Sequence, residues 1–294
     1  METTQAEALP LDGLVAPPEE KRRPHLTIRP SRGWIGLDLR EIWQFRDLLE
    51  SLALRDLKLR YKQTVLGVLW VVLVPLMAAG VFSFVFGTVA KLPSGKVPYL
   101  VFSFAGLLGW SYFAGVLTKI SACLLGNSNL ISKVFFPRLI LPFSTIASNL
   151  VDFLVSAAVM AVLLVIYHVV PSPALLLLPV WMIMLTAVAL GLGLSTAALA
   201  VSYRDIPYII PVFTQILLYA SPVAYSVNAV PARLRWVYSL NPLTPPLEAM
   251  RASLLGTAFP AAQSLLISAG LSFCILVIGL YSFKRMESKF ADVI

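Results

Sequence analysis

The residues best suited to chemistry are four cations, Arg55, Lys58, Arg60 and Lys62, which lie just before the first long apolar run of the chain. On a helix, Arg55, Lys58 and Lys62 fall at positions i, i+3 and i+7 and therefore share one face. A cationic helix that leads into a membrane span places its charges at the level of the lipid headgroups. The cluster could receive an anionic substrate there, or it could act only as a topology signal that orients the first span.

Sequence motifs for catalysis or nucleotide binding are missing. Gly95 and Lys96 lack the upstream glycine spacing and the following Ser or Thr of a phosphate-binding loop. The chain also has no HExxH, no Cys–His cluster and no Gly-x-Ser-x-Gly pattern. Cys123 and Cys274 show no paired spacing, and we expect two buried thiols. We therefore expect no enzymatic activity, no catalytic residue, no metal site and no cofactor in this chain.

One acid, Asp152, lies inside a long apolar segment, one helical turn after Asn149. A carboxylate at that depth is a candidate functional group and should face the interior of the helix bundle or a cavity. It could relay protons in a secondary transporter, although no second titratable group or broken-helix repeat accompanies it. The alternative is a structural polar contact with Asn149, Ser148 or Lys119.

Aromatic residues are frequent in the apolar segments. Ring faces can stack on sugar rings and give a weak grip on a moving glycan. The same residues could instead face lipid or pack inside the bundle. The candidates for a glycan path are Trp70, Phe82, Phe86, Trp110, Phe113, Tyr219 and Tyr225.

The composition predicts that the elements carrying these residues are membrane helices. The 294 residues are 58% hydrophobic and only 13% charged, with a mean hydropathy of +0.82. Several apolar runs reach the ~20 residues that a helix needs to cross a bilayer. We expect an all-α membrane protein with six transmembrane helices, at 64–89, 98–120, 140–167, 174–200, 207–226 and 261–283. The net charge of +8 does not indicate a nucleic-acid partner, because the cations gather at the ends of these runs.

The first 63 residues divide into a tail and an amphipathic helix. Residues 1–36 are polar, contain prolines and lack the pattern of a signal peptide, so we expect a flexible cytoplasmic tail. Over residues 37–63, Ile42, Phe45, Leu49 and Leu52 recur with helical spacing, and Trp43 lies beside them. This pattern predicts an amphipathic helix in the membrane interface, although a soluble amphipathic helix would look the same. Residues 64–294 form the predicted six-span transmembrane domain.

The distribution of cations predicts the orientation. Six spans place both termini on one side of the membrane, and that side holds most of the Lys and Arg residues even when the tail is left out. By the positive-inside rule, both termini are expected to be cytoplasmic in a multi-pass protein surrounded by membrane lipids.

The predicted cytoplasmic connection between spans two and three, residues 123–141, is too long to be a simple turn. Asn127, Ser128 or Asn129 could cap a short helix there. Its apolar residues Leu130, Ile131 and Val134 would either dock a cytoplasmic partner or tuck against the base of the bundle.

The predicted external connection, residues 226–260, contains five prolines that flank apolar pieces too short to span the bilayer. Such pieces suggest re-entrant or interfacial helices between spans five and six. They would form a periplasmic lid over an exit path or a structural plug at a subunit interface. The candidate lid residues are Trp236, Asn241, Glu248 and Arg251, of which Glu248 and Arg251 are spaced to pair on one helix face.

The segment RDLKLRYKQTVLGVLWVVLVP at 55–75 resembles the amino-terminal signature of the permease subunits of ABC exporters for polysaccharides and polyol phosphates. These are the O-antigen, capsule and teichoic-acid exporters. Further matches follow in order: NSNLISKVFFPRLILP at 127–142, YRDI at 203–206, SPVAY at 221–225 and NPLTPPLEAMR at 241–251. The resemblance extends from about residue 40 to the end of the chain.

The resemblance implies a homodimer in the bacterial inner membrane with two separate nucleotide-binding subunits, which would bind ATP and Mg and drive export of a lipid-linked glycan. It also implies that a coupling helix with Asn127, Leu130, Ile131 and Lys133 meets the ATPase. The four cations at 55–62 would suit the phosphates of an undecaprenyl pyrophosphate carrier. We expect O-antigen export, with teichoic-acid or capsule export as the alternative. A proton-coupled secondary transporter that uses Asp152 is the alternative hypothesis from a different functional class.

Overall fold

The structure is a computed structural model that describes residues 39–62, 69–95 and 97–287. Within these ranges the chain forms α-helices, short 3₁₀- and π-helical segments, turns and loops, without a strand. The prediction of an all-α protein is therefore confirmed. The predicted tail over 1–36 lies outside the described residues.

Five helical segments of the described chain are long and apolar enough to cross a membrane. The first, Leu69–Val89, is α3 (Leu69–Phe82) continued by a π-helical segment (Ser83–Val89). The others are α4 (Tyr99–Gly126), α6 (Ile140–Ile166), a 3₁₀ turn (Pro173–Leu177) joined to α7 (Leu178–Ser202), and α11 (Ala262–Met286). The chain is thus a multi-pass membrane protein.

The predicted fifth span is shorter than the others. The apolar helix α8 (Ile206–Ala220) has 15 residues. At 1.5 Å per residue this is about 22 Å, less than the ~30 Å of a bilayer core. The predicted span 207–226 extends six residues beyond the observed helix, because the chain leaves helical geometry at Ser221. A total of six spans therefore stays a prediction.

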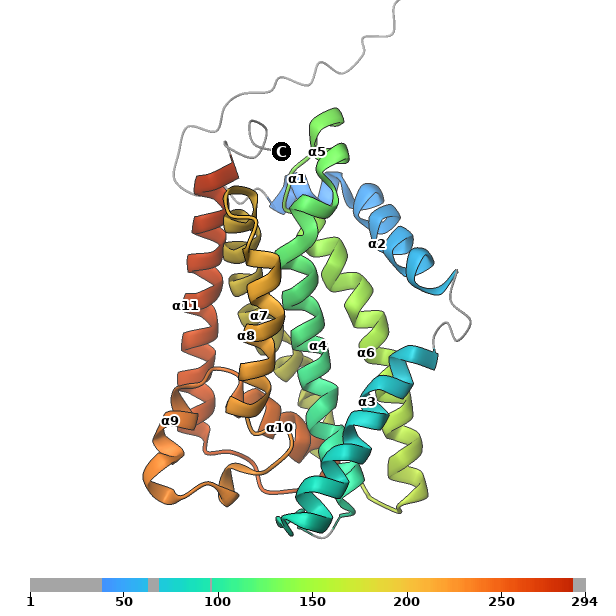
Figure 1. Ribbon diagram of the computed structural model, residues 1–294, viewed down its shortest axis with the longest axis vertical. Coiled ribbons are helices and arrows are strands. Elements are labelled where there is room, and N and C mark those ends of the chain that lie inside the picture. Colours follow the sequence, from blue (N-terminus) through green and yellow to red (C-terminus); the bar gives the residue numbers. More distant parts are fainter. Residues whose placement is uncertain (1–38, 63–68, 96, 288–294) are drawn as a thin grey trace, which may run out of the picture. The chain divides into compact units, whose positions relative to one another are not determined.

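Helix α4 is the centre of the bundle (Figure 1) and contacts α3, α6, α7, α8 and α10. Most of its side chains are buried, including Phe104, Leu117 and Ile120. Helices α7 and α11 approach each other very closely where Gly191 meets Gly279, because a Cβ at either position would collide with the facing backbone. Small residues allow this close backbone packing between membrane helices.

The predicted interface helix is broken into α1 (Leu39–Gln44) and α2 (Arg46–Tyr61). The apolar stripe of the sequence faces protein: Leu52 is buried, and Ile42, Phe45 and Leu49 pack against the core. Helix α2 contacts α6. Trp43 is exposed on the other side. The apolar face is therefore covered by the bundle, and the location of α1 and α2 at a membrane interface stays a prediction.

The remaining elements are short. Helix α5 (Ser128–Lys133) follows α4 directly, and α9 (Arg235–Leu240) and α10 (Thr244–Leu255) lie between α8 and α11. Figure 1 shows α5 and α9 at opposite ends of the bundle. Helix α10 begins with Pro245 and Pro246 and ends at Gly256, which has a left-handed φ of 66°. Nearly every residue of α10 is buried, so protein surrounds this short helix, as a re-entrant helix requires.

Candidate functional site

Three of the four predicted cations line one groove on α2. This groove, the cationic groove, has a volume of about 430 Å³ and is lined by Ser51, Leu54, Arg55, Lys58, Leu59 and Lys62. The three cations are exposed, as are the aliphatic side chains of Leu54 and Leu59. The side chain of Arg60 lies outside the described part. Positive charge beside apolar surface suits an amphiphile with an anionic headgroup.

Arg55 connects the cationic groove to the start of α5. Its Nη2 donates to Oδ1 of Asn127 at 2.7 Å and also contacts Asp56 at 3.2 Å. The side chain of Asn127 makes no capping bond to α5 and instead donates from Nδ2 to the carbonyl of Cys123 at 2.9 Å. Asn127 was a predicted cap for this helix. In the structure it joins α2 to the end of α4 instead.

The expected docking helix divides into a buried and an exposed part. Ile131 is buried and Leu130 is partly buried, so both pack against the base of the bundle. Lys133, Val134 and Phe135 are exposed, Phe135 to 61%. The exposed apolar surface lies at and just after the end of α5, at Lys133–Phe135, whereas Ile131 belongs to the core.

Asp152 lies with Lys119 in a cavity of about 250 Å³ between α3, α4 and α6. The Nζ of Lys119 is 3.5 Å from Oδ2 of Asp152. Asn149 lines the same cavity and donates to the carbonyl of Thr145. This geometry matches the expected polar contact, with Lys119 as the partner.

The seven candidate aromatic residues do not come together as one surface. Trp110 and Phe113 are buried within the bundle, with ring centroids 5.4 Å apart. Phe82 and Phe86 pack edge to face near the end of the first span. Trp70 lines the cavity of Asp152. A glycan path along these residues stays a prediction for the exposed members, whereas Trp110 and Phe113 serve packing here.

Two aromatic candidates, Tyr219 and Tyr225, lie at the end of α8 and just after it. Tyr219 is exposed, and its carbonyl accepts a hydrogen bond from the hydroxyl of Tyr225 at 2.8 Å. The same hydroxyl is 2.8 Å from that of Tyr238 on α9. Tyr225 thus links the end of α8 to α9.

Arg251 on α10 holds the segment that follows α8. Its Nη2 donates to the carbonyls of Pro222 and Val223, both at 2.6 Å, and its Nη1 donates to that of Tyr225 at 3.1 Å. The guanidinium carbon lies 4.3 Å from the ring centroid of Phe102 on α4. The side chain is only 3% exposed. Burial lowers the pKa of Arg251 to about 10, so the group stays charged at neutral pH.

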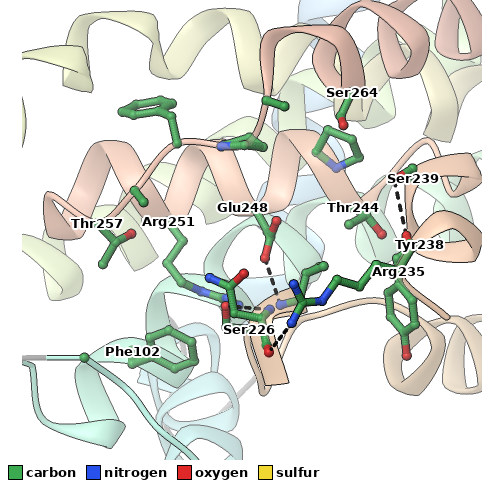
Figure 2. A pocket seen from close by; sticks show the side chains of 18 of the residues that line it. Phe102, Ser226, Arg235, Tyr238, Ser239, Thr244, Glu248, Arg251, Thr257 and Ser264 are labelled. Carbon is green, nitrogen blue, oxygen red and sulfur yellow. Dashed lines mark hydrogen bonds between the residues drawn. The ribbon is translucent and has the colours of Figure 1, made fainter. Parts of the chain in front are cut away.

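Glu248 binds the same segment independently. Its Oε1 accepts a hydrogen bond from the backbone N–H of Val227 at 3.0 Å, as Figure 2 shows. Burial raises the pKa of the Glu248 carboxyl. The spacing of Glu248 and Arg251 suggested a pair on one helix face. In the structure, each side chain instead uses its short contacts to anchor the backbone of residues 222–227.

The other two candidate lid residues differ from each other. The Nδ2 of Asn241 donates to Oγ of Ser221 at 3.0 Å, and its Oδ1 accepts from the N–H of Leu243. Trp236 on α9 is exposed. Asn241, Glu248 and Arg251 therefore converge on the segment after α8, and Trp236 does not. Two further contacts were not predictable from the sequence: Phe102 packs beneath Arg251, and the hydroxyl of Tyr99 donates to the carbonyl of Ala224 at 2.7 Å.

A cavity of about 620 Å³, the α10 cavity, opens beside these contacts. Residues of α9, α10, the start of α11 and the loop at 226–228 line it, with Phe102 on the α4 side. Figure 2 shows Thr244, Glu248 and Arg251 among its lining residues. Two buried polar atoms in this lining, Thr244 Oγ1 and Arg251 Nε, have no hydrogen-bond partner among the described residues.

The comparisons with known proteins agree with one family. Residues 47–255 match the family model described as ABC-2 type transporter. An O-antigen export system permease protein RfbA of Klebsiella pneumoniae is 30% identical over 255 residues, which cover 84% of this chain and 95% of that protein. RfbA of Myxococcus xanthus is also 30% identical, over 87% of this chain and 98% of its own length.

A more distant relative is named for a different substrate. The polysialic acid transport protein KpsM of Escherichia coli is 24% identical over 81% of this chain and 93% of its own length. The family match covers more than half of the chain and includes α2 from Asp47, α5 and all of α10. The chain belongs to the ABC-2 type transporter family.

Proposed function

We propose that this chain is the transmembrane subunit of an ATP-driven exporter that moves a lipid-linked O-antigen across the bacterial inner membrane. Two relatives that match nearly the whole chain are O-antigen export permeases. The structural observation that carries the proposal is the cationic groove, because it places Arg55, Lys58 and Lys62 on one exposed face. An exporter of another polysaccharide is the second candidate, since the polysialic acid transport protein KpsM is also similar.

The cationic groove would receive the phosphates of the lipid carrier. Guanidinium and ammonium groups form strong charge-assisted hydrogen bonds with phosphate oxygens. The exposed Leu54 and Leu59 would lie against the first part of the lipid chain, because the same groove presents both kinds of surface. An undecaprenyl pyrophosphate carrier has this combination of charge and hydrocarbon.

ATP hydrolysis would occur on a separate nucleotide-binding subunit that binds ATP and Mg. The exposed Lys133–Phe135 surface at the end of α5 would contact that subunit. The hydrogen bond from Arg55 to Asn127 connects this surface to the cationic groove through the first residues of α5. A movement of α5 would therefore reach the substrate-binding face directly.

The opposite end of the bundle would form the exit. With both termini cytoplasmic, α9 and α10 would lie on the periplasmic side, and α10 would be a re-entrant helix that lines the way out. The burial of α10 by protein supports this role, since a short helix in a membrane needs its terminal backbone groups satisfied by protein or water. Two copies of the chain would form the transport path.

The test removes the positive charges of the cationic groove by substitution. A triple variant, Arg55→Gln, Lys58→Gln and Lys62→Gln, should still insert and assemble but should reduce the amount of glycan at the cell surface by tenfold or more. A matched triple variant, Arg46→Gln, Arg204→Gln and Arg285→Gln, removes three exposed cations outside the groove and should export normally. Equal export by both variants would contradict a role of the groove in substrate handling.

A further inference from the structure

We propose that the α10 cavity is a binding subsite for one neutral sugar residue of the transported glycan, a proposal that rests on the proposed function. Its volume of about 620 Å³ lies within the range of roughly 300–1,000 Å³ typical of ligand sites. The lining is rich in hydroxyl groups, from Ser226, Tyr238, Ser239, Thr244, Thr257 and Ser264. Hydroxyl groups both donate and accept hydrogen bonds, as the hydroxyls of a sugar do.

Unused hydrogen-bonding capacity in the wall points to a polar ligand. Thr244 is only 4% exposed, and its Oγ1 has no partner among the described residues. A buried polar atom without a partner costs free energy, and a bound hydroxyl would recover it. Glu248 uses Oε1 for the N–H of Val227. No described residue donates to its Oε2, which leaves one carboxylate oxygen for a ligand donor.

The hydrogen-bonding groups of the cavity suit a sugar better than a phosphate. Arg251 directs its terminal nitrogens to the carbonyls of residues 222, 223 and 225 and stacks on Phe102. Arg235 likewise donates to the carbonyls of Asn228 and Val230. These bonds to backbone leave few guanidinium donors for the acceptor oxygens of a phosphate. The free hydroxyl groups of a sugar can donate hydrogen bonds to the carboxyl group of Glu248.

An apolar surface for the sugar ring is present as well. Phe259 lines the cavity and is 40% exposed, and its ring centroid lies 6.5 Å from that of Trp181 on α7. The carbon–hydrogen face of a pyranose packs well on such a ring. The lining therefore offers hydroxyl and carboxyl groups for the hydroxyls of a sugar and an aromatic ring for its carbon–hydrogen face.

The position of the cavity separates it from the cationic groove. Tyr99, the first residue of α4, contacts the segment after α8, and Asn127, just beyond its end, contacts Arg55. The 28 residues of α4 correspond to about 42 Å of helix. A glycan whose carrier phosphate binds at one end would therefore meet the α10 cavity only after its sugar chain has crossed the bundle.

The experiment measures sugar binding to the full chain, with its ATPase subunit, in lipid nanodiscs by saturation-transfer difference NMR. The probes are the methyl glycosides of glucose, galactose, mannose, rhamnose and N-acetylglucosamine, each alone, and glucose 1-phosphate. At least one neutral glycoside should give a signal, and glucose 1-phosphate should give one at least fivefold weaker. No signal from any glycoside, or a stronger signal from the phosphate, would overturn the proposal.

Variants assign the signal to the cavity. Thr244→Val keeps the shape and removes the hydroxyl, and it should lower the signal at least fivefold, whereas Thr244→Ser should retain it. Thr88→Val changes an exposed threonine outside the cavity and should have no effect. An unchanged signal in Thr244→Val, or loss of the signal in both Thr244 variants, contradicts the assigned role of the hydroxyl. Normal export without sugar binding would refute this subsite alone, and sugar binding without glycan export would refute the proposed function alone.

Discussion

At the scale of single residues, Arg251 shows how a buried charge can organise a membrane protein. Its guanidinium group satisfies three backbone carbonyls that come directly after α8, where helical hydrogen bonding stops. Gly106 on α4 makes room for it, since a Cβ there would collide with Arg251 and the carbonyl of Val223. The guanidinium group thus supplies hydrogen-bond donors to the backbone carbonyls of a non-helical segment. Backbone groups in a membrane environment need such partners.

This role predicts a clear loss of stability in Arg251→Met. The substitution keeps a long side chain but leaves three carbonyl groups without a donor, and each such buried acceptor costs about 1–3 kcal/mol. The free energy of unfolding should fall by roughly 3 kcal/mol or more. The midpoint of thermal unfolding of the purified protein should then fall by about 6 °C or more.

The control is Arg233→Met, which changes an exposed arginine of the same connection. Its unfolding midpoint should stay within a degree or two of the unaltered protein. If Arg251→Met unfolds at the same temperature as Arg233→Met, the guanidinium group does not hold the segment after α8.

At the scale of elements, α5 shows which features of a short helix could be predicted from the sequence. Its location was predictable, because Asn127–Asn129 and Pro137 bracket an apolar stretch. Which apolar residues face outward was not predictable, since Ile131 is buried by contacts with other parts of the bundle. Similarly, the prolines around α10 marked a short helix, but the contacts of Glu248 and Arg251 depend on a loop more than 20 positions earlier in the chain.

The burial pattern of α5 predicts different effects for two substitutions. Phe135→Asp should release the ATPase subunit during purification and leave the unfolding midpoint of the chain unchanged, because Phe135 is exposed. Ile131→Asp should lower the unfolding midpoint, because it buries a carboxylate in an apolar core. Copurification and thermal unfolding are the two measurements.

A matched control for this pair is Val170→Asp, at an exposed apolar position in the connection that follows α6. The complex should stay intact in this variant. Retention of the ATPase subunit by Phe135→Asp would show that the Lys133–Phe135 surface is not the docking surface.

At the scale of the whole molecule, the fold class followed from composition, and most spans followed from hydropathy. Four of the five long apolar helices lie close to the predicted ranges, whereas α4 continues six residues beyond its predicted end at 120, and α8 ends at Ala220, six residues before its predicted end at 226. Their spacing predicted that Arg55, Lys58 and Lys62 share one helix face. In the structure all three line the cationic groove. The α10 cavity was not predictable, because stretches that are far apart in the chain, from Pro93 to Ser264, build it together.

The central position of α4 in the molecule explains why Trp110 and Phe113 are buried and not exposed. Sequence spacing does not distinguish a helix in the middle of a bundle from one at its edge, because both are apolar on all sides in a membrane. Helix α4 is the central helix, so its aromatic side chains fill the interior. The contact between Asp152 and Lys119 likewise depends on tertiary packing, because the two residues lie on different helices, α6 and α4.

The central claim, that this chain exports a lipid-linked glycan with energy from a separate ATPase, is tested most directly by mass spectrometry of lipid-linked glycans in native host cells that lack it. We expect the glycan on its lipid carrier to accumulate in the inner membrane and to be missing from the cell surface. The unaltered chain should restore export only when its ATPase partner can hydrolyse ATP. A normal amount of surface glycan without the chain, or restored export with an inactive ATPase, would contradict the account.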